Sequence, residues 1–445
     1  MPTDRPNIVL MISHDLGCHF GPYGWANESS THLDRLAGES IRLERHFVTS
    51  PGCSPSRATL VTGRYPHCNG QLGLSHLGWT LNRDEIPLPR VLRDGGYRTA
   101  MFGIWHLHEW SLAEFDDLSD DVPCRDASPE GPAEVSSHRA AEWLKQRADG
   151  KQPFFLHVGF WEPHRPFRGH ERAAQDWPEV DPDAVRLPDY LPDNRATRRE
   201  MADFQRSLSM ADAGVGRVLD ALDHTGLAEN TLVIFTSDHG IAFPRAKGTL
   251  YDPGIQVGFL ARWPGRIQPG ISSPALTSNV DCMPTLLEAA GLDCPQRVQG
   301  RSFLDLLTGH DQGKGDREAV FAEKTYHEHY DPIRSVRTDR FKYISNFADR
   351  PRLVLPSDIY NSPTRQSIGD DESIWSHRDP EELYDLHNDP GEKTNLADSA
   401  EHAETAARLR AQLDRWMQET ADPLLDGPIG RPASRHHLEG PRIGS

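Results

Sequence analysis

The chain has 445 residues, with 48 Lys and Arg against 66 Asp and Glu, so its formal net charge is −18. This acidic balance argues against a nucleic-acid-binding protein, which needs a basic surface to match phosphates. A hydrophobic content of 37% is enough to bury a sizeable core, and six scattered cysteines without CxxC spacing argue against a disulfide framework. No run reaches the ~20 apolar residues of a membrane helix. The short apolar run near the N-terminus is expected to be a buried strand rather than a signal peptide. The default expectation is therefore a cytoplasmic protein.

Strands and helices are predicted to alternate along the first 330 residues. In chain order they are a strand at 7–13, helices at 31–38 and 86–94, a strand at 97–104, a helix at 136–147, a strand at 154–160, a long helix at 199–222, strands at 230–236 and 256–262, a helix at 284–290 and a strand at 319–323. This alternation predicts an α/β fold in which helices cover both faces of a large, mixed, mostly parallel sheet.

The pattern changes beyond residue 330. A hairpin is predicted over 333–346, followed by a Pro-rich irregular stretch to about 381, a short strand at 383–386 and a periodic helix at 400–420. The residues after Pro423 have the composition of a loose tail. We therefore predict a catalytic domain over 1–330 and a smaller α+β domain over 331–445.

The densest chemical signal is the segment CSPSRATLVTGR at residues 53–64. It resembles the sulfatase signature C-x-P-S-R-x-x-x-L-T-G, with Val61 at the position of the leucine. In that family, whose fold is alkaline-phosphatase-like, a maturation enzyme oxidises the motif cysteine to formylglycine, so the resemblance implies that Cys53 is the precursor of the nucleophile. The alternative, a buried structural thiol, would leave Pro55, Ser56 and Arg57 unexplained.

The chemistry of sulfate transfer explains why an aldehyde is used. Its hydrate carries two geminal hydroxyls, of which one attacks sulfur and the other, once deprotonated, lets the hemiacetal collapse and expel sulfate. A plain serine would be trapped as a stable sulfate ester. Arg57, one helical turn after Cys53, is a candidate to hold the nucleophile's oxygens and offset developing charge.

A divalent metal site is predicted from polar residues at strand ends. Asp15 follows the first strand, and Asp238 and His239 follow the strand at 230–236, where α/β sheets build ligand sites. The resemblance adds Cys53 and His14, but most sulfatases have a pair of aspartates where this chain has His14 and Asp15. Imidazole favours Mn²⁺ over Ca²⁺, whereas Ca²⁺ would be expected if His14 turned away from the ion.

Three further residues match catalytic positions of the family. The segment GIWHL at 103–107 resembles G-K-W-H-x, in which His106 would be the base that drives hemiacetal collapse. His164 would contact sulfate or the leaving group, and Lys247 would bind sulfate and could protonate the leaving atom. Ile104 stands where the family has a lysine, so one sulfate-binding cation is absent.

Within the family, the chain is most similar to the heparan N-sulfatase (sulfamidase) group, from about residue 6 to residue 425. In that group a His-Glu pair lines the sugar pocket, which makes His327 and Glu328 substrate-binding candidates. Their alternative interpretation is a polar turn at the end of a strand. Glu162 and Arg245, which lie two residues before His164 and Lys247, are further substrate-binding candidates.

The leading hypothesis is therefore a formylglycine sulfatase that hydrolyses a sulfate ester or an N-sulfate of a sulfated sugar. Its expected partners are a sulfated saccharide and a formylglycine-generating or other maturation enzyme; neither nucleic acid nor membrane is expected, and homo-oligomerisation stays open. Two alternatives remain: a phosphodiesterase or phosphonate monoester hydrolase with the same nucleophile, and a degenerate homologue that binds sulfated glycans without turnover.

Overall fold

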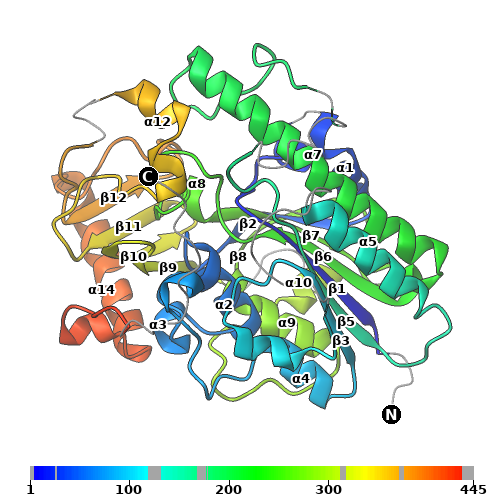
Figure 1. Ribbon diagram of the computed structural model, residues 1–445. Helices are drawn as coiled ribbons and strands as arrows, with labels where there is room; N and C mark the ends of the chain where they lie inside the picture. The colour runs from blue at the N-terminus through cyan, green and yellow to red at the C-terminus, as the bar shows by residue number, and fades with distance from the viewer. Residues whose placement is uncertain are drawn as a thin grey trace.

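A mixed sheet of eight strands forms the centre of the molecule, with its strands in the order β4-β3-β5-β1-β6-β7-β2-β8 (Figure 1). The computed structural model describes residues 5–25, 28–118, 132–167, 177, 179–310, 317–369 and 375–432. The strands are β1 (Asn7–Ser13), β2 (Ile41–Phe47), β3 (Arg98–Gly103), β4 (Asp117–Leu118), β5 (Phe154–Gly159), β6 (Thr231–Ser237), β7 (Gln256–Arg262) and β8 (Ile271–Ser278). Because β7 runs antiparallel to β6 and β2, the sheet is mixed, while its other neighbouring pairs are parallel.

Helices cover both faces of this sheet. The helices are α1 (Thr31–Gly38), α2 (Cys53–Thr62), α3 (Pro66–Asn69), α4 (Leu88–Asp94), α5 (Pro132–Lys145), α7 (Arg195–His224), α8 (Asp252–Ile255), α9 (Cys282–Ala289), α10 (Leu304–Thr308), α11 (Ser357–Tyr360), α12 (Pro363–Ile368) and α14 (Ala403–Glu419). Short 3-10 helices are η1 (Gly21–Tyr23), η2 (Glu28–Ser30), η3 (Ser75–Leu77), η4 (Glu109–Glu114), η5 (Leu227–Asn230), η6 (Asn279–Asp281), η7 (Ala400–His402) and η8 (Pro423–Asp426).

The central strand β1 shows why the sheet needs both layers. Its side chains are buried along the whole strand, and successive side chains of a strand point to opposite faces. Val9 and Met11 pack with the side of the core that contains α1, α5 and α7. Ile8 and Leu10 pack with the side that contains α2, α4, α9 and α10. The predicted α/β fold with a large, mostly parallel sheet is thus confirmed.

A second, antiparallel sheet lies beside the first, with strands in the order β12-β11-β10-β9. These strands are β9 (Ala319–Tyr326), β10 (Tyr330–Thr338), β11 (Phe341–Asn346) and β12 (Glu381–Asp385). Leu409, Leu413 and Trp416 of α14 pack against one face of it. A smaller α+β unit after the large sheet is therefore confirmed. The division near residue 330 stays a proposal, and a division that keeps this sheet whole would precede β9.

Three strands of the large sheet, β2, β4 and β8, were absent from the sequence prediction. β2 pairs with β7 and β8, and together β2 and β8 form one edge of the sheet. In β2, buried Ile41 and Leu43 alternate with less buried Arg42 and Glu44, which is the period-2 pattern of a strand with one solvated face. The predicted tail after Pro423 begins with η8, and residues 433–445 lie outside the described residues.

Candidate active site

The carboxyl ends of β1 and β6 bring the first group of polar side chains together. The two strands are parallel neighbours, and Ser13 is in register with Ser237. Asp15 and Asp238 follow directly, and the backbone N–H of Asp15 donates to Asp238 Oδ1 at 3.0 Å. Asp15 has a φ of 53°, in the left-handed region, so the chain turns sharply where it leaves the sheet.

The amino end of α2 brings Cys53 to the same place. Cys53 is the first residue of the helix, and its Sγ lies 3.2 Å from His239 Nε2. Burial raises the pKa of the Cys53 thiol well above its ordinary value. One turn further on, Arg57 Nε donates to Asp238 Oδ2 at 3.0 Å, and its NH1 donates to the carbonyl of Ile104 at 3.3 Å. Its NH2 group is buried and without a partner among the described residues.

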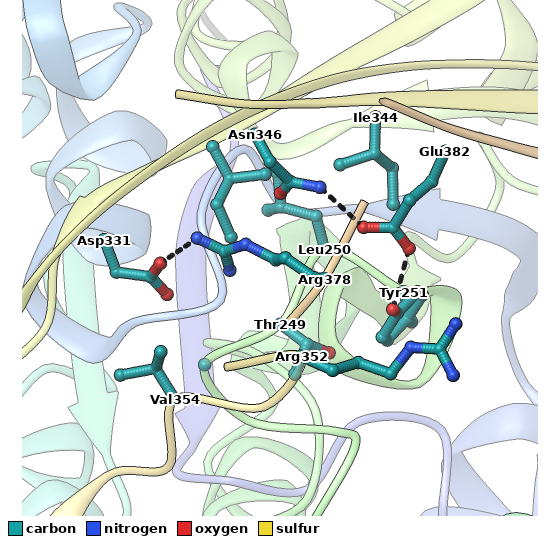
Figure 2. A pocket seen from close by; sticks show the side chains of 12 residues that line it. Thr249, Leu250, Tyr251, Asp331, Ile344, Asn346, Arg352, Val354, Arg378 and Glu382 are labelled. Atoms are coloured by element: carbon teal, nitrogen blue, oxygen red, sulfur yellow. Dashed lines mark hydrogen bonds and ion pairs between the residues drawn. The ribbon is translucent and has the colours of Figure 1, made fainter. Parts of the chain in front are cut away.

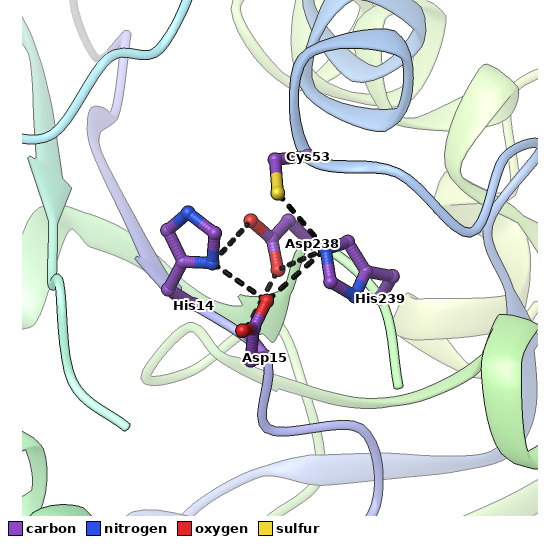
Figure 3. Close-up of side chains that lie close together, drawn as sticks. All are labelled: His14, Asp15, Cys53, Asp238 and His239. Carbon is purple, nitrogen blue, oxygen red and sulfur yellow. Dashed lines mark hydrogen bonds and ion pairs between the residues drawn. The ribbon is translucent and has the colours of Figure 1, made fainter. Parts of the chain in front are cut away.

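Five side chains converge into one buried cluster, shown in Figure 3, whose ligand atoms all lie within 4.8 Å of one another. Its members are those predicted as the metal site: His14, Asp15, Cys53, Asp238 and His239. Asp15 Oδ1 lies 2.8 Å from His14 Nδ1 and 3.1 Å from His239 Nε2, and Asp238 Oδ2 lies 3.3 Å from His14 Nδ1.

This donor set fits a divalent cation. Two buried carboxylates repel each other unless positive charge lies between them, and both imidazoles direct a ring nitrogen toward the same carboxylate oxygens. The set offers two carboxylates, two imidazole nitrogens and the side chain of residue 53, which would provide oxygen instead of sulfur once converted to formylglycine. The Nδ1 atom of His14 faces both carboxylates, and its role as a metal ligand stays a prediction.

Lys247 bridges this cluster to a residue that the sequence prediction missed. Its Nζ donates to Asp15 Oδ2 at 2.9 Å and to Asp358 Oδ2 at 2.7 Å. Burial alone would lower the pKa of Lys247, but the two carboxylates hold it well above its ordinary value. The amine is therefore a permanent buried cation. Asp358 lies in α11, inside the Pro-rich stretch, where no periodicity marked it.

Two histidines complete the wall of the site. His164 Nε2 lies 3.5 Å from Lys247 Nζ, and the His164 ring contacts the His14 ring edge-on, with 4.4 Å between centroids. Burial, followed by the charge of Lys247, lowers the pKa of His164 to about 3, so its imidazole is neutral. His106 is half-buried, and its Nδ1 is shielded from solvent and has no partner among the described residues. Burial also lowers its pKa well below the ordinary value, so its imidazole is neutral.

Two of the substrate-binding candidates have their polar groups engaged elsewhere. Glu162 Oε2 accepts from the N–H of Ala133 at 3.0 Å, at the start of α5, and burial raises the pKa of Glu162 to about 7. Arg245 donates through NH2 to the carbonyl of Gly391 at 2.7 Å and stacks over the ring of Tyr251. Contact of either side chain with substrate stays a prediction.

The other two candidates differ in their surroundings. His327 is buried, and neither of its ring nitrogens has a partner among the described residues. Its ring is close to the turn before Cys53, since a Cβ placed on Gly52 would lie 3.6 Å from His327 Cδ2. Glu328 accepts a hydrogen bond from the N–H of Ser357 at 2.7 Å, beside Asp358. Its carboxylate thus ties the β9–β10 turn to α11.

A small cavity of about 20 Å³ lies behind residues 248–251, between them, the second sheet and the side chains of Arg352, Val354 and Arg378 (Figure 2). Glu382 accepts hydrogen bonds from Tyr251 at 2.8 Å and from Asn346 at 2.7 Å, and Arg378 pairs with Asp331. Because the cavity has room for little more than one water molecule, it supports the loop rather than binding a sugar.

Comparison with known proteins identifies the family. A family model described as Sulfatase matches residues 6–292, which is more than half of the chain. The chain belongs to the sulfatase family. A second model, described as the C-terminal part of N-sulphoglucosamine sulphohydrolase, matches residues 240–367. The family is one of hydrolases acting on sulfate, so the recognition made from residues 53–64 is confirmed.

Individual sulfatases match along most of their length. N-sulphoglucosamine sulphohydrolase of Homo sapiens is 31% identical, over 96% of this chain and 93% of its own. An ulvan-active sulfatase of Formosa agariphila is 29% identical, over 94% of this chain and 76% of its own. Among solved structures, a 2-O glycosaminoglycan sulfatase superposes with a TM-score of 0.72 at 23% identity, over 97% of this chain and 95% of its own, and shows the shared fold. Among the described residues of this sulfatase, no helix is both long and apolar enough to cross a membrane.

Proposed function

We propose that this protein hydrolyses a sulfate ester or an N-sulfate of a sulfated saccharide, with formylglycine made from Cys53 by a sulfatase-maturation enzyme as the nucleophile. The observation that carries the proposal is the position of Cys53 at the first turn of α2, with its Sγ 3.2 Å from His239 Nε2 inside the buried cluster. The positive end of a helix favours an anion there. A structural thiol would not need four ionisable neighbours.

The cluster residues are the groups that would hold the divalent metal, which we propose to be Mn²⁺ in preference to Ca²⁺ because of the two imidazoles. Such a metal, when bound, supplies positive charge beside the nucleophile and a sulfate oxygen. A formylglycine hydrate supplies one hydroxyl for attack on sulfur and a second for the release of sulfate. The chain's own residues then have to bind, orient and move protons around that group.

Four cationic or imidazole groups would surround the place where sulfate lies. Arg57 NH2 has no partner among the described residues and is free to bind a nucleophile or sulfate oxygen. Lys247 Nζ, held charged by two carboxylates, would bind another sulfate oxygen. The same amine could protonate the leaving atom, and the neutral His164, whose Nε2 lies 3.5 Å from it, would contact sulfate or the leaving group. His106, which is neutral and has an unpartnered Nδ1 among the described residues, would take the proton of the second hydroxyl.

The relatives indicate the substrate class. The human relative's name specifies an N-sulfated glucosamine, and the relative from Formosa is named for ulvan. A structural neighbour is described in complex with its substrate D-glucosamine-2-N,6-O-disulfate. We infer that the present protein acts on sulfated sugars of polysaccharide origin, with sulfate bonded to oxygen or nitrogen.

A substrate panel tests the proposal. The protein, produced together with a formylglycine-generating enzyme, would be given N-sulfated and O-sulfated glucosamines, a sulfated uronic-acid disaccharide and an aryl phosphodiester at equal concentrations. Release of sulfate from at least one sugar, faster than hydrolysis of the phosphodiester, is expected. Faster turnover of the phosphodiester would replace this proposal by the phosphodiesterase alternative. The matched control is Cys53→Ala, which should release no sulfate from any sugar.

A further inference from the structure

The residue after His164 forms a buried ion pair that the proposed chemistry does not use. Arg165 NH1 donates to Oε1 of Glu200, in the second turn of α7, and the two side chains are only 8% and 5% exposed. Met201 and Phe204, close to Glu200 on the same helix, belong to the core that packs α7 against the large sheet. The ion pair is therefore anchored on a rigid part of the fold.

The guanidinium of Arg165 also holds the loop that carries Lys247. Its Nε donates to the carbonyl of Ala242 at 2.7 Å, and it lies over the ring of Phe243, 5.0 Å from the centroid. The N–H of Lys247 in turn donates to the carbonyl of Ile241 at 3.1 Å. A shift of Arg165 would therefore move the backbone to which Lys247 is bound.

The backbone of Arg165 sets the orientation of the His164 ring. The Nδ1 of His164 lies against the carbonyl of Arg165, and a neutral imidazole that donates from Nδ1 keeps Nε2 as an acceptor. This Nε2 is the nitrogen that faces Lys247 Nζ, 3.5 Å away. The ring orientation and the tautomer of His164 thus depend on the position of Arg165.

The second oxygen of Glu200 holds a third segment. Glu200 Oε2 accepts from the N–H of Thr364 at 3.0 Å, at the start of α12. Two residues separate α12 from α11, and the N–H of Ser362 donates to the carbonyl of Ile359 at 2.9 Å, so the two helices are joined by a hydrogen bond. Because α11 contains Asp358, Glu200 fixes the segment that places this carboxylate beside the buried amine.

We propose that Arg165 and Glu200 are positioning residues for the leaving-group side of the site. Their ion pair holds His164, Lys247 and Asp358 at the mutual distances that sulfate transfer needs. These three side chains lie 83 and 111 residues apart along the chain, so local connectivity does not fix their geometry. Both positioning residues act through these side chains rather than on the reacting atoms. The inference rests on the proposed function and adds to it the residues that hold the site together.

Steady-state kinetics of Glu200→Gln tests the proposal. The carboxylate accepts from two donors, whereas an amide has one acceptor oxygen and a donor NH2, so one of the two hydrogen bonds of Glu200 must be lost. Turnover of a sulfated sugar should fall roughly ten- to hundredfold, the effect of a misplacement of about 1 Å. Turnover of an aryl sulfate should fall by a smaller factor, because its leaving group needs less protonation. Equal factors for the two substrates, or unchanged turnover of the sugar, would overturn the proposal.

Two further variants separate positioning from loss of folded protein. Arg165→Lys keeps the buried charge, but one amine cannot replace the planar guanidinium that binds Ala242 and Glu200 together, so it should show the same difference between substrates. The matched control is Asp212→Asn, a buried carboxylate of α7 that accepts from the N–H groups of His32 and Leu33, at 3.0 and 2.8 Å. This control should lower the melting temperature and leave the ratio of the two turnover rates unaltered. An altered ratio in the control alone would overturn the proposal.

Amide hydrogen exchange tests the positioning without turnover, and so separates its failure from failure of the proposed function. Glu200→Gln should speed exchange in segments 160–167, 240–247 and 357–364 together, whereas Asp212→Asn should speed it in 31–38 and not in these three. Exchange that stays at the wild-type rate in all three segments of Glu200→Gln would overturn the proposal. A protein that hydrolyses no sulfated sugar but shows faster exchange in all three segments would contradict the proposed function and support the joint anchoring of the loops.

Discussion

In wild type the free energy of unfolding should fall as pH rises into the alkaline range, and replacing His67 by glutamine should remove most of this fall. The His67 side chain is fully buried at the start of α3, and its Nδ1 lies 2.7 Å from Glu323 Oε1 in β9. Arg334 of β10 lies between Glu323 and Asp422, with NH2 3.4 Å from Glu323 and 3.0 Å from Asp422. Two carboxylates and one guanidinium leave a net negative charge, which protonation of His67 cancels.

The shift in the pKa of His67 sets how much free energy of unfolding its charged form contributes. Burial by itself lowers this pKa, but the charge of Glu323 and hydrogen bonds to His67 raise it to about 10, against about 6.5 in an unfolded chain. Since the folded value is the higher one, the charge pair contributes its full stability below about pH 6.5 and loses it as pH rises through 10. We expect a contribution of about 3–5 kcal/mol, the usual cost of breaking a buried ion pair.

The assay is chemical unfolding of wild type and His67→Gln at pH 6 and at pH 10.5. The difference in the free energy of unfolding should be about 3–5 kcal/mol at pH 6 and fall to about 1 kcal/mol at pH 10.5, where wild type too has a neutral side chain at this position. His310→Gln, whose side chain is 76% exposed, should show no such change. A difference between wild type and His67→Gln that is the same at both pH values would refute the reasoning.

Three further predictions concern the active site. Lys247→Ala should lower turnover of sulfated sugars by roughly 10²–10⁴. It should lower turnover of aryl sulfates by a smaller factor, because good leaving groups need less protonation. Equal losses for the two substrate types would mean that Lys247 does not protonate the leaving group. Asp358→Asn should lower kcat roughly tenfold, because it releases one of the two anions that position the amine, and should also lower the melting temperature because it removes one partner of a buried ion pair; an unchanged kcat would mean that Asp15 alone holds the amine. After treatment with a chelator, wild type should regain activity with Mn²⁺, and in His14→Asp the metal that restores most activity should change from Mn²⁺ toward Ca²⁺. Full recovery of wild type with Ca²⁺ alone would exclude His14 as a ligand.

The central part of the fold and the cluster around Cys53 were accessible from the sequence because each depends on local signals. β1 is an uninterrupted apolar run, and Asp15 directly follows it. The carboxyl ends of neighbouring parallel strands meet at one edge, so Asp15 and Asp238 had to lie close together. The signature at residues 53–64 supplied Cys53, and His14 and His239 are the chain neighbours of the two aspartates.

What the sequence did not predict depends on contacts between distant segments. Asp358 lies 111 residues after Lys247, in an irregular stretch where no periodicity marks a functional position. The assignment of β9 to the second sheet follows from its pairing with β10 rather than from its composition. Arg245 has the residue type of an anion binder, but its direction is set by the carbonyl of Gly391, which only the folded chain brings near.

The most direct test of the account is the fate of Cys53. After co-expression with a formylglycine-generating enzyme, mass spectrometry of the peptide that contains Cys53 should show a product about 18 Da lighter than the thiol form, and Cys53→Ser should complete at most one turnover and then retain bound sulfate. An unmodified thiol in protein that is fully active on a sulfated sugar, or steady turnover by Cys53→Ser, would contradict the formylglycine mechanism.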